Sequence, residues 1–466
     1  MRIETDSMGD MEVAEGALYG ASTQRAVLNF PVSGHRAPEV FIRAAGLLKW
    51  AAASANEQLG LLESDLAESL REAAWEIYQG GLDEHFPVDV FQTGSATSWN
   101  MNVNEVIANR ASQLANKPIG SRQPLHPNDH CNLGQSSNDT MPTCLHLSVA
   151  LALRERLRPA LSSLAAALDG RSEAFDPIIK SGRTHWMDAT PVSMGQVFSG
   201  YASRVRKSIE RVDGSIEMLR ELAIGGTAVG TGINTHPEFA AKVIALLNEQ
   251  TGFSFREASN HFEAQSARDD CVAVACQLTA IAVSLNKIAN DIRMSASGPR
   301  CGLGELQLPA TQPGSSIMPG KVNPVMCEML IQTCLYVRGL CHSVVLGGTE
   351  AAFELNVAIP LMAYSLHESV RCLANAATLF SERCVAGITV DEERCGANVQ
   401  NSLMLVTALN PHIGYDKAAA VAKRAYKENK TLREVVLEEG LMEADELDRV
   451  LDPRSMINPA SPPSPR

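Results

Sequence analysis

The stretch VAVACQLTAIAVSLNKIANDI, residues 272–292, decides the fold of this chain. Neither Gly nor Pro occurs between residues 253 and 297, so no residue there is a strong helix breaker. Apolar side chains recur along the stretch at spacings of 4, 3, 4, 3 and 4 residues. This pattern is the heptad seam of a long helix packed in a bundle. The residues of the seam are Val274, Leu278, Ile281, Leu285, Ile288 and Ile292.

Helical patterns continue on both sides of the seam and predict an all-α, mainly helical fold. The longer segments are residues 145–168, 194–222, 325–345 and 361–379, and shorter ones cover 41–58 and 66–78. Five long helices indicate a central bundle. Because such apolar helices must bury several faces, we expect the bundle to pair with other subunits rather than stay monomeric.

The pattern divides the chain into three predicted domains. Residues 1–135 form an N-terminal domain rich in turns and polar motifs, and residues 136–392 form the helical bundle that serves as oligomerisation core. Residues 393–466 form a small helical C-terminal domain. Its Pro/Ser-rich end, residues 458–466, has the composition of a disordered tail.

Charge and cysteine usage narrow the class of protein. The 466 residues hold 53 acidic and 40 basic side chains, a formal net charge of -13. Such a surface repels phosphate backbones and anionic lipid, so we expect no nucleic-acid or membrane partner, and no uninterrupted apolar stretch suits a bilayer. The eleven cysteines form no CxxC pair, and residues 1–15 are acidic rather than apolar. Reduced thiols in a cytoplasmic protein follow.

Four polar clusters interrupt the helical patterns and are the candidate sites. Clusters of this kind beside apolar helices are costly unless they bind something. They are TGSATSWNMN at 93–102, HPNDH at 126–130 with QSSND at 135–139, GRTHWMD at 182–188, and GSSIMPGKVNP at 314–324 with Glu328 beyond.

Each cluster also has a plainer reading. The first reads equally as a loop before a helix from Glu105, with Asn104 as the N-cap. His126 and His130 have a metal-binding spacing, but Pro127 disfavours the helix it needs, so no metal is expected. Ser136-Ser-Asn138 opens a helix from Pro142, and its N–H groups suit an anion or simply cap the helix. A lone His185 is more often structural than catalytic.

The glycine-rich segments do not indicate a nucleotide site. Gly320-Lys321 is followed by Val322, and the glycine spacing around it does not match a phosphate-binding loop. Residues 225–232 lack a preceding strand pattern, so a dinucleotide site is not expected there. No cofactor is expected.

The fourth cluster resembles the signature loop of the fumarase/aspartase superfamily. The other three match the remaining motifs of that superfamily in order, so the resemblance runs from about residue 6 to residue 457. It implies a three-domain helical fold. It also implies a homotetramer with a twenty-helix core, and active sites that each take residues from three subunits.

The resemblance also implies roles for individual residues. Ser315 matches the catalytic base and His185 the second catalytic position, where it positions or activates water, with Glu328 as its carboxylate partner. Lys321 matches a catalytic carboxylate ligand. The matched substrate-binding positions are Ser95, Thr97, Ser136, Ser137, Asn138, Thr184, Ser316, Lys321 and Asn323. His126, Asn128 and Asp129 match a second, shallower dicarboxylate site.

These roles are chemically coherent. Removing a proton beside a carboxylate places extra negative charge on that carboxylate, and preorganised donors lower the barrier by about 3 kcal/mol each. A serine hydroxyl is a weak base, so Ser315 requires positive groups that stabilise its alkoxide. Lys321 and helix N-termini would also reverse the negative field of the chain locally.

Within the superfamily, several positions resemble the iron-independent fumarases. Ser137, His126 and Gly320 favour reversible hydration of fumarate to (S)-malate over the alternative, aspartate ammonia-lyase or a lyase of a related dicarboxylate. Gln312 instead resembles aspartases. Trp99 either narrows the pocket or packs away from it. A third alternative is an inactive structural relative, against which the intact catalytic positions argue.

Overall fold

The computed structural model describes residues 1–459. The chain forms two compact units. Unit 1 comprises residues 1–159, 208–283 and 333–375, and unit 2 comprises residues 160–207, 284–332 and 376–466. The division assigns parts of the long helices to each unit. The predicted tail beyond residue 459 lies outside the described residues, and the division into three domains stays a prediction.

Unit 1 holds the N-terminal helices and the first halves of the polar motifs. Its strands pair into small two-stranded sheets: β1 with β2 and β8 with β9 are antiparallel, and β5 with β6 is parallel. The elements that lie wholly in it are β1 (Arg2–Asp6), β2 (Gly9–Val13), α1 (Ala21–Asn29), α2 (Glu39–Gln58), α3 (Ser64–Gln79), α4 (Thr97–Leu114), α5 (Ser137–Ala152), β5 (Glu221–Leu222), α8 (Phe239–Thr251), β6 (Arg256–Glu257), α9 (His261–Ser266), β8 (Ala351–Ala352) and β9 (Leu355–Asn356).

Unit 2 holds a hairpin, a long loop and the C-terminal helices. Its sheets are β3 with β4 and β10 with β7, both antiparallel. The elements that lie wholly in it are β3 (Ile179–Thr184), β4 (Met187–Ser193), β7 (Leu306–Gln307), β10 (Thr389–Val390), α13 (Glu392–Asn401), α14 (Asn410–Ile413), α15 (Tyr415–Glu428), α16 (Leu432–Glu438) and α17 (Ala444–Val450). The C-terminal helices enclose their own core around Leu409, Val421 and Val435.

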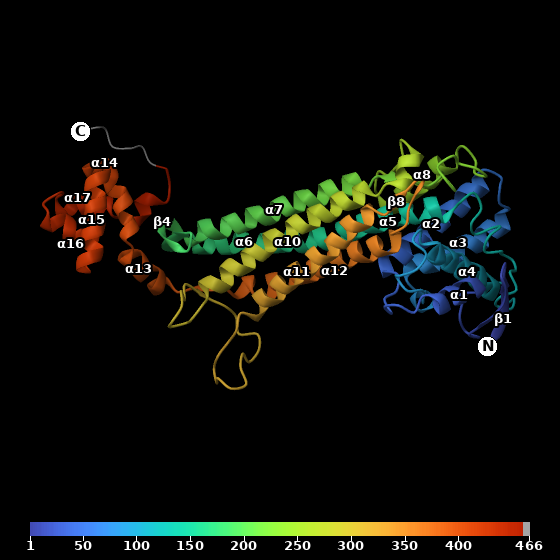
Figure 1. Cartoon of the computed structure of the whole chain (residues 1–466), viewed down its shortest axis with the longest axis horizontal. Coiled ribbons are helices and arrows are strands. Elements are labelled where there is room, and N and C mark those ends of the chain that lie inside the picture. The colour runs from blue at the N-terminus through green and yellow to red at the C-terminus, as the bar shows by residue number, and fades with distance from the viewer. Residues whose placement is uncertain (460–466) are drawn as a thin grey trace. The chain divides into compact units, whose positions relative to one another are not determined.

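Five further helices make up most of the bundle, and within each unit their segments run side by side (Figure 1). A π-helical turn, Leu153–Leu157, joins α5 to the first of them. They are α6 (Arg158–Phe175), α7 (Met194–Met218), α10 (Asp269–Ser295), α11 (Val325–Gly348) and α12 (Ile359–Arg383). The mainly helical fold is therefore confirmed.

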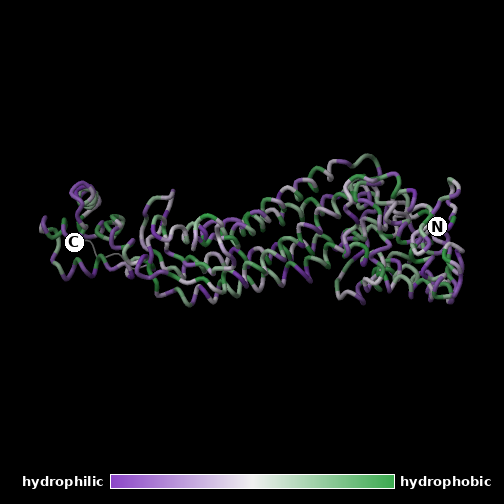
Figure 2. Tube along the Cα trace, turned by 90° about the horizontal axis from the view of Figure 1, so that it is seen from below, coloured by the Kyte–Doolittle hydropathy of each residue, from purple (hydrophilic) through white to green (hydrophobic). Residues whose placement is uncertain are grey.

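The heptad seam lies in α10 and is buried as predicted. Each of its six residues is at most 1% exposed. Hydrophobic and hydrophilic residues alternate along the helices of the bundle, so each helix keeps an apolar stripe for its neighbours (Figure 2). Burial of this stripe is the main favourable contribution to the bundle.

Two predicted helix starts were wrong. α4 begins at Thr97 rather than Glu105, and α5 begins at Ser137 rather than Pro142. In α4, polar residues with weak helix propensity are held by tertiary hydrogen bonds, so Asn100 and Asn104 lie inside a helix instead of a loop. In α5, the Ser136 cap starts the helix early, and the helix continues through Pro142.

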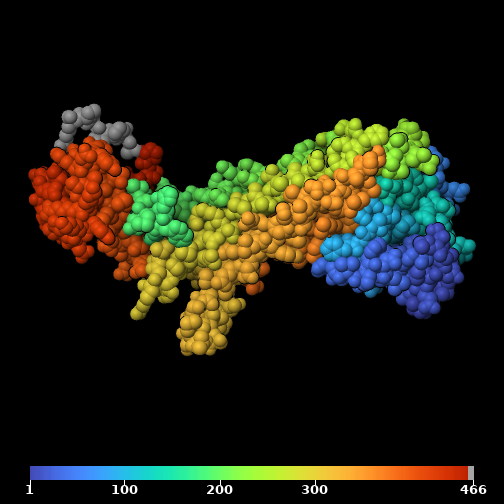
Figure 3. Space-filling model, in the orientation of Figure 1, coloured from blue at the N-terminus to red at the C-terminus, as the bar shows by residue number. Residues whose placement is uncertain are grey.

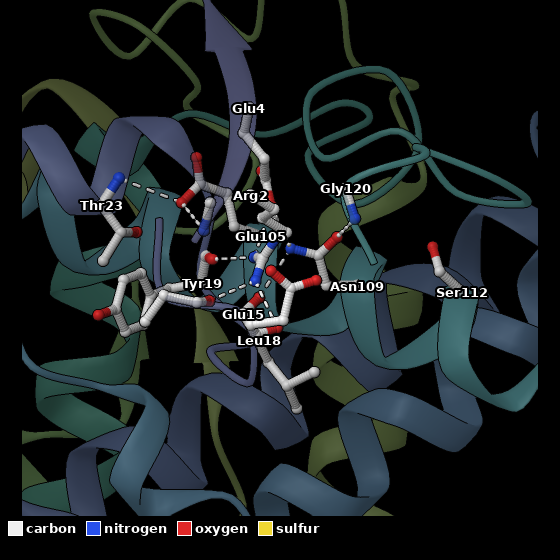
Figure 4. A network of polar contacts seen from close by, with 12 residues as sticks. Arg2, Glu4, Glu15, Leu18, Tyr19, Thr23, Glu105, Asn109, Ser112 and Gly120 are labelled. Atoms are coloured by element: carbon white, nitrogen blue, oxygen red, sulfur yellow. Dashed lines mark hydrogen bonds and ion pairs between the residues drawn. The ribbon is translucent and has the colours of Figure 1, made fainter. Parts of the chain in front are cut away.

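A buried polar network anchors α4 to the N-terminus (Figure 4). The Glu105 carboxylate of α4 accepts hydrogen bonds from the backbone N–H groups of Gly20, Ser22 and Thr23, at 2.8, 2.9 and 3.1 Å. These donors lie at the start of α1, where a negative charge is favourable. Arg2 donates to the carbonyl of Tyr19 at 2.9 Å. The network fixes the helix whose N-terminus carries Ser95 and Thr97.

Two helices of the bundle are long and apolar enough to suit a bilayer, whereas the sequence analysis expected no such stretch. By length and composition α10 and α11 could each cross a membrane, with 44% and 28% of their most apolar windows buried. A helix that is apolar on several faces is found in protein cores as well as in membranes. All eleven cysteines are described and are free thiols.

We expect a graded loss of stability at Ile281, which is 0% exposed in the seam of α10. Ile281→Ala should lower the free energy of unfolding by about 2–5 kcal/mol, and Ile281→Val by only about 0.5–1.5 kcal/mol. Thermal and urea unfolding followed by circular dichroism would measure both. Equal effects of the two substitutions would show that the site is not closely packed.

Candidate active site

Two helix N-termini of unit 1 meet at a cluster of hydroxyl groups. Thr97 is the first residue of α4, and Ser137 is the first residue of α5. The Thr97 hydroxyl lies 2.8 Å from the Ser95 hydroxyl and 2.8 Å from the Ser137 hydroxyl. Two helix N-termini next to neutral donors form a place where a carboxylate is favourable.

The glycine before this cluster is required by close packing. A Cβ atom on Gly94 would lie 1.9 Å from the Val357 carbonyl oxygen, and the amide of Ile359 donates to the Gly94 carbonyl at 3.0 Å. Ala96 then adopts a left-handed conformation with φ of 61° to start α4. The turn thus points Ser95 and Thr97 toward each other.

The N-terminus of α5 is held by a capping box that reaches a second loop. Asp139 accepts from the Ser136 amide at 2.9 Å, and its other oxygen accepts from the amides of Gly225 and Thr227 at 3.1 and 2.9 Å. Asn138 donates to the Ala228 carbonyl at 2.8 Å. The glycine-rich segment 225–232 therefore folds over the start of α5.

A cavity of about 550 Å³ opens between these loops. It is lined by residues from both predicted sites of unit 1, Ser136 of the substrate set and Asn128 and Asp129 of the second site. Thr227 and Ala228 line its other side. The cavity therefore gives access to Ser136.

His126 is engaged within its own turn. Its ring Nδ1 lies 3.2 Å from the amide nitrogen of Asp129 and 3.2 Å from an oxygen of the Asp129 carboxylate. His130 accepts from the His126 amide at 2.9 Å. The turn is not helical, as Pro127 predicted, and the described residues contain no group of three or more metal-ligating side chains.

Trp99 packs into the core of unit 1 and does not narrow the site. It is 3% exposed, its indole N–H donates to the Val88 carbonyl at 3.3 Å, and its ring lies 5.0 Å from that of Phe41. Gln312 is exposed in the long loop of unit 2.

In unit 2, His185 stands at the tip of the β3–β4 hairpin. Thr184 pairs with Met187, so His185 and Trp186 are the two turn residues, with φ of 54° and 66°. Left-handed conformations are strained for residues other than glycine, by about 1–3 kcal/mol each. Thr184 and His185 are exposed, and Trp186 is 72% exposed. The strained turn holds the His185 imidazole in an exposed position.

The long loop of unit 2 closes on itself around Ser315, and Figure 3 shows it projecting from the surface. Asn323 donates to the Gly314 carbonyl at 2.6 Å. A Cβ atom on Gly314 would lie 2.0 Å from the Lys321 carbonyl oxygen, so only glycine fits. The Ser315 hydroxyl oxygen accepts from the amides of Ile317 and Met318, at 3.3 and 3.0 Å. Two N–H groups pointing at this oxygen favour its negative form.

The remaining predicted residues of unit 2 are placed without mutual contact. Ser316 and Lys321 are exposed in the loop, and Glu328 lies in the first turn of α11. Among residues 1–459, no hydrogen bond or ion pair joins His185 to Glu328 or to Ser315. The structure therefore brings together the hydroxyl cluster of unit 1 and, separately, the Ser315 loop of unit 2.

Three residues that position the site were missed by sequence reasoning. Asp139 could have been found from the Ser136-x-x-Asp139 capping pattern. Lys49 carries a signal of its own, a single cation within the apolar run of residues 44–53. Glu305 carries no local signal, because its partners are far along the chain.

Glu305 ties the His185 hairpin to the base of the Ser315 loop. Its carboxylate is 0% exposed and lies 3.2 Å from the Lys180 ammonium and 2.7 Å from the Arg183 guanidinium, both in β3. Burial raises the pKa of Glu305, but the hydrogen bond from Arg183 and the charges of Arg183 and Lys180 outweigh burial and bring it below 4.5. The hairpin of His185 and the loop of Ser315 therefore share one buried carboxylate, which pairs with two cations.

Comparison with known proteins places these motifs in a family. The family model described as Lyase matches residues 9–339, and the one described as Fumarase C C-terminus matches residues 405–458. The chain is 48% identical to the class II fumarate hydratase of Neisseria meningitidis over 98% of this chain and 99% of that protein. It is 51% identical to the class II fumarate hydratase of Halobacterium salinarum, over 98% of this chain and 97% of that one.

Solved structures give the same picture. The class II fumarase of Schistosoma mansoni superposes with a TM-score of 0.96 at 37% identity, covering 99% of this chain and all of that one. A Brucella melitensis structure described as a fumarate lyase:delta crystallin bound to cobalt superposes with a TM-score of 0.94 at 41% identity, covering 98% of this chain and 100% of that chain.

We expect Glu305→Gln to lower the free energy of unfolding by about 3–5 kcal/mol, because it leaves Lys180 and Arg183 without their buried counter-charge. The effect should depend on pH. Since the pKa of Glu305 is lower in the folded state, its contribution is complete above about pH 4.5 and is lost as the pH falls through the folded value.

Thermal unfolding at pH 7 and at pH 4 would measure this. The difference in unfolding midpoint between wild type and variant should be smaller at pH 4. Glu428→Gln, an exposed ion-pair carboxylate in unit 2, is the matched control and should shift the midpoint little. A gap that is equal at both pH values would show that the charge of Glu305 does not stabilise the hairpin.

Proposed function

This chain belongs to the class II fumarate hydratase family and catalyses the reversible hydration of fumarate to malate, and we propose that Ser315 is its catalytic base. His185 assists by positioning or activating water, with Glu328 as its carboxylate partner. Lys321 is the cation that meets a substrate carboxylate. The reaction needs no organic cofactor in this proposal.

In the direction from malate, the Ser315 alkoxide removes a proton from C3. The electron pair moves onto the adjacent carboxylate and gives an aci-carboxylate intermediate. The electron pair then returns to form the C2–C3 double bond as the C2 hydroxyl leaves, and in this proposal His185 donates the proton that makes it water. Hydration of fumarate follows the same steps in reverse, and addition is anti because base and water act on opposite faces.

One observation carries the role of Ser315. Its hydroxyl oxygen accepts from two backbone amides, at 3.3 and 3.0 Å. Such bonds favour the alkoxide over the alcohol, which a serine base requires. Lys321 and the amide of Asn323 belong to the same loop and can meet the carboxylate on which charge develops.

The substrate carboxylates are bound, in this proposal, by the clusters of neutral donors. Ser95, Thr97 and Ser137 are already held in one hydrogen-bonded row, so they are preorganised. Ser136, Asn138, Thr184, Ser316 and Asn323 complete the substrate set. His126, Asn128 and Asp129 form a second dicarboxylate site.

The active assembly we propose is a homotetramer with a twenty-helix core and sites shared between three subunits. Apolar side chains on the bundle helices of unit 1 support it, because Val283, Leu335 and Leu346 are 46, 55 and 54% exposed in the single chain. Surfaces of this kind are normally covered by another protein. In unit 2, Ile317 beside Ser315 is 83% exposed, so the loop also has room for a partner. A cytoplasmic location stays a prediction.

We expect Ser315→Ala to lower kcat for both directions by about 10²- to 10⁴-fold while the oligomer stays intact. Absorbance of the fumarate double bond measures turnover, and light scattering measures the mass. Ser316→Ala removes the neighbouring hydroxyl of the same loop and should raise KM more than it lowers kcat. Near-normal turnover of Ser315→Ala would remove Ser315 from the base role. Ammonia release from aspartate, tested on the wild type, would detect the alternative lyase activity.

We expect His126→Asn to keep most of the activity, because His126 belongs to the second site and its ring is engaged with Asp129. Initial rates over a range of fumarate concentrations would measure this. If the variant were nearly inactive, the assignment of the primary and second sites would have to be exchanged.

A further inference from the structure

Lys49 is a buried cation without a hydrogen-bonded counter-ion. It lies in α2 and is 1% exposed. Its ammonium donates to the Cys131 carbonyl at 3.3 Å, the Asn132 amide oxygen at 3.2 Å and the Gln135 amide oxygen at 3.0 Å. No carboxylate within residues 1–459 bonds to it. A buried charge paired only with neutral acceptors is less stable than an apolar side chain, so packing alone does not explain a lysine here.

The acceptors of Lys49 lead directly to the hydroxyl cluster. The amide oxygen of Asn132 also accepts from Asn100 at 3.1 Å and from Asn104 at 3.2 Å, both in α4. Asn100 follows Thr97 by one helical turn. Gln135 comes directly before Ser136, the cap of α5. Lys49 is thus connected to both helix N-termini that carry the candidate substrate ligands.

None of the described groups around Lys49 forms an ion pair with it. The titratable groups that face it are Cys131 in the loop and Cys144 and Asp139 in α5. Burial raises the pKa of both thiols to about 12, so they are neutral. Asp139 directs its oxygens to three backbone amides instead of to Lys49. Burial also lowers the pKa of Lys49 to about 8, so it is mainly cationic at neutral pH.

We propose that Lys49 is a positioning residue for dicarboxylate binding. It holds the loop of residues 131–135 between α2 and α4, and it keeps a positive charge behind the Thr97 and Ser137 hydroxyls. It does not touch the substrate. The inference rests on the proposed role of those hydroxyls as substrate ligands, and it identifies a source of positive potential behind them in a chain of net charge -13.

Lys49→Met tests the proposal, because methionine keeps the length of the side chain and removes the charge and the three donors. We expect kcat/KM for fumarate to fall by about 10- to 100-fold, with most of the change in KM. The Kd of succinate, a dicarboxylate that cannot react, should rise by the same factor as KM. His146→Leu is the matched control, since it removes another buried polar side chain of unit 1, which is hydrogen-bonded to the backbone carbonyl of Glu221. It should leave KM within about twofold.

The pH dependence gives a readout that a merely structural role would not move. In the wild type, the Kd of succinate should rise as the pH passes through about 8, because Lys49 loses its proton there. Lys49→Met should lack this step. Gln135→Glu places a carboxylate on the Lys49 ammonium and keeps the side-chain length, so Kd should rise at pH 7 and the step should move to higher pH.

Gln135→Glu also decides the question if Lys49→Met does not fold. The proposal is overturned if folded Lys49→Met binds succinate like the wild type, if it keeps the step near pH 8, or if Gln135→Glu leaves both Kd and step unchanged. Thr97→Val, measured in parallel, separates the two levels of inference. If Thr97→Val binds succinate normally, the ligand assignment fails; if only Thr97→Val weakens binding, the role of Lys49 alone fails.

Discussion

The meeting of two helix N-termini at Thr97 and Ser137 is the constraint on which the candidate site depends. The positive ends of two helix dipoles repel one another, so hydrogen bonds from the residues behind them must hold the two ends together. The amide oxygen of Asn132 accepts hydrogen bonds from the side chains of Asn100 and Asn104 there. Asp139 satisfies three further amides. A carboxylate ligand would complete the arrangement.

In unit 2, a buried carboxylate rather than a set of amides holds the candidate site residues in place. The hairpin that presents His185 is strained at two consecutive residues, and the long loop around Ser315 is closed by hydrogen bonds within itself. Both are anchored at their bases by Glu305, which is fully buried between Lys180 and Arg183. Rigid bases with exposed tips suit a site that is finished by neighbouring subunits.

Exposure links the fold to the proposed assembly. The seam of α10 is buried within the chain, yet other faces of α10 and α11 are apolar and open. A helix of this kind has several apolar faces and needs more than one set of neighbours. The exposed apolar faces of these helices are therefore the observation that supports the proposed multi-subunit core.

The sequence by itself determined the helical bundle. The 3.6-residue period of apolar side chains is a local property of the sequence, and it places these side chains on one face of each helix, which is then buried. It also located the four polar clusters, and Asn323 closes the loop that holds Ser315 through its hydrogen bond to the Gly314 carbonyl. Only the tertiary structure decided where α4 begins, since Asn100 and Asn104 are poor helix formers until Asn132 bonds them. It alone decided that Trp99 is a core residue. It also revealed Lys49 and Glu305. Lys49 bonds to Cys131, which is 82 residues away in the chain, and Glu305 bonds to Arg183, which is 122 residues away. Partners at such distances leave no pattern in the local sequence.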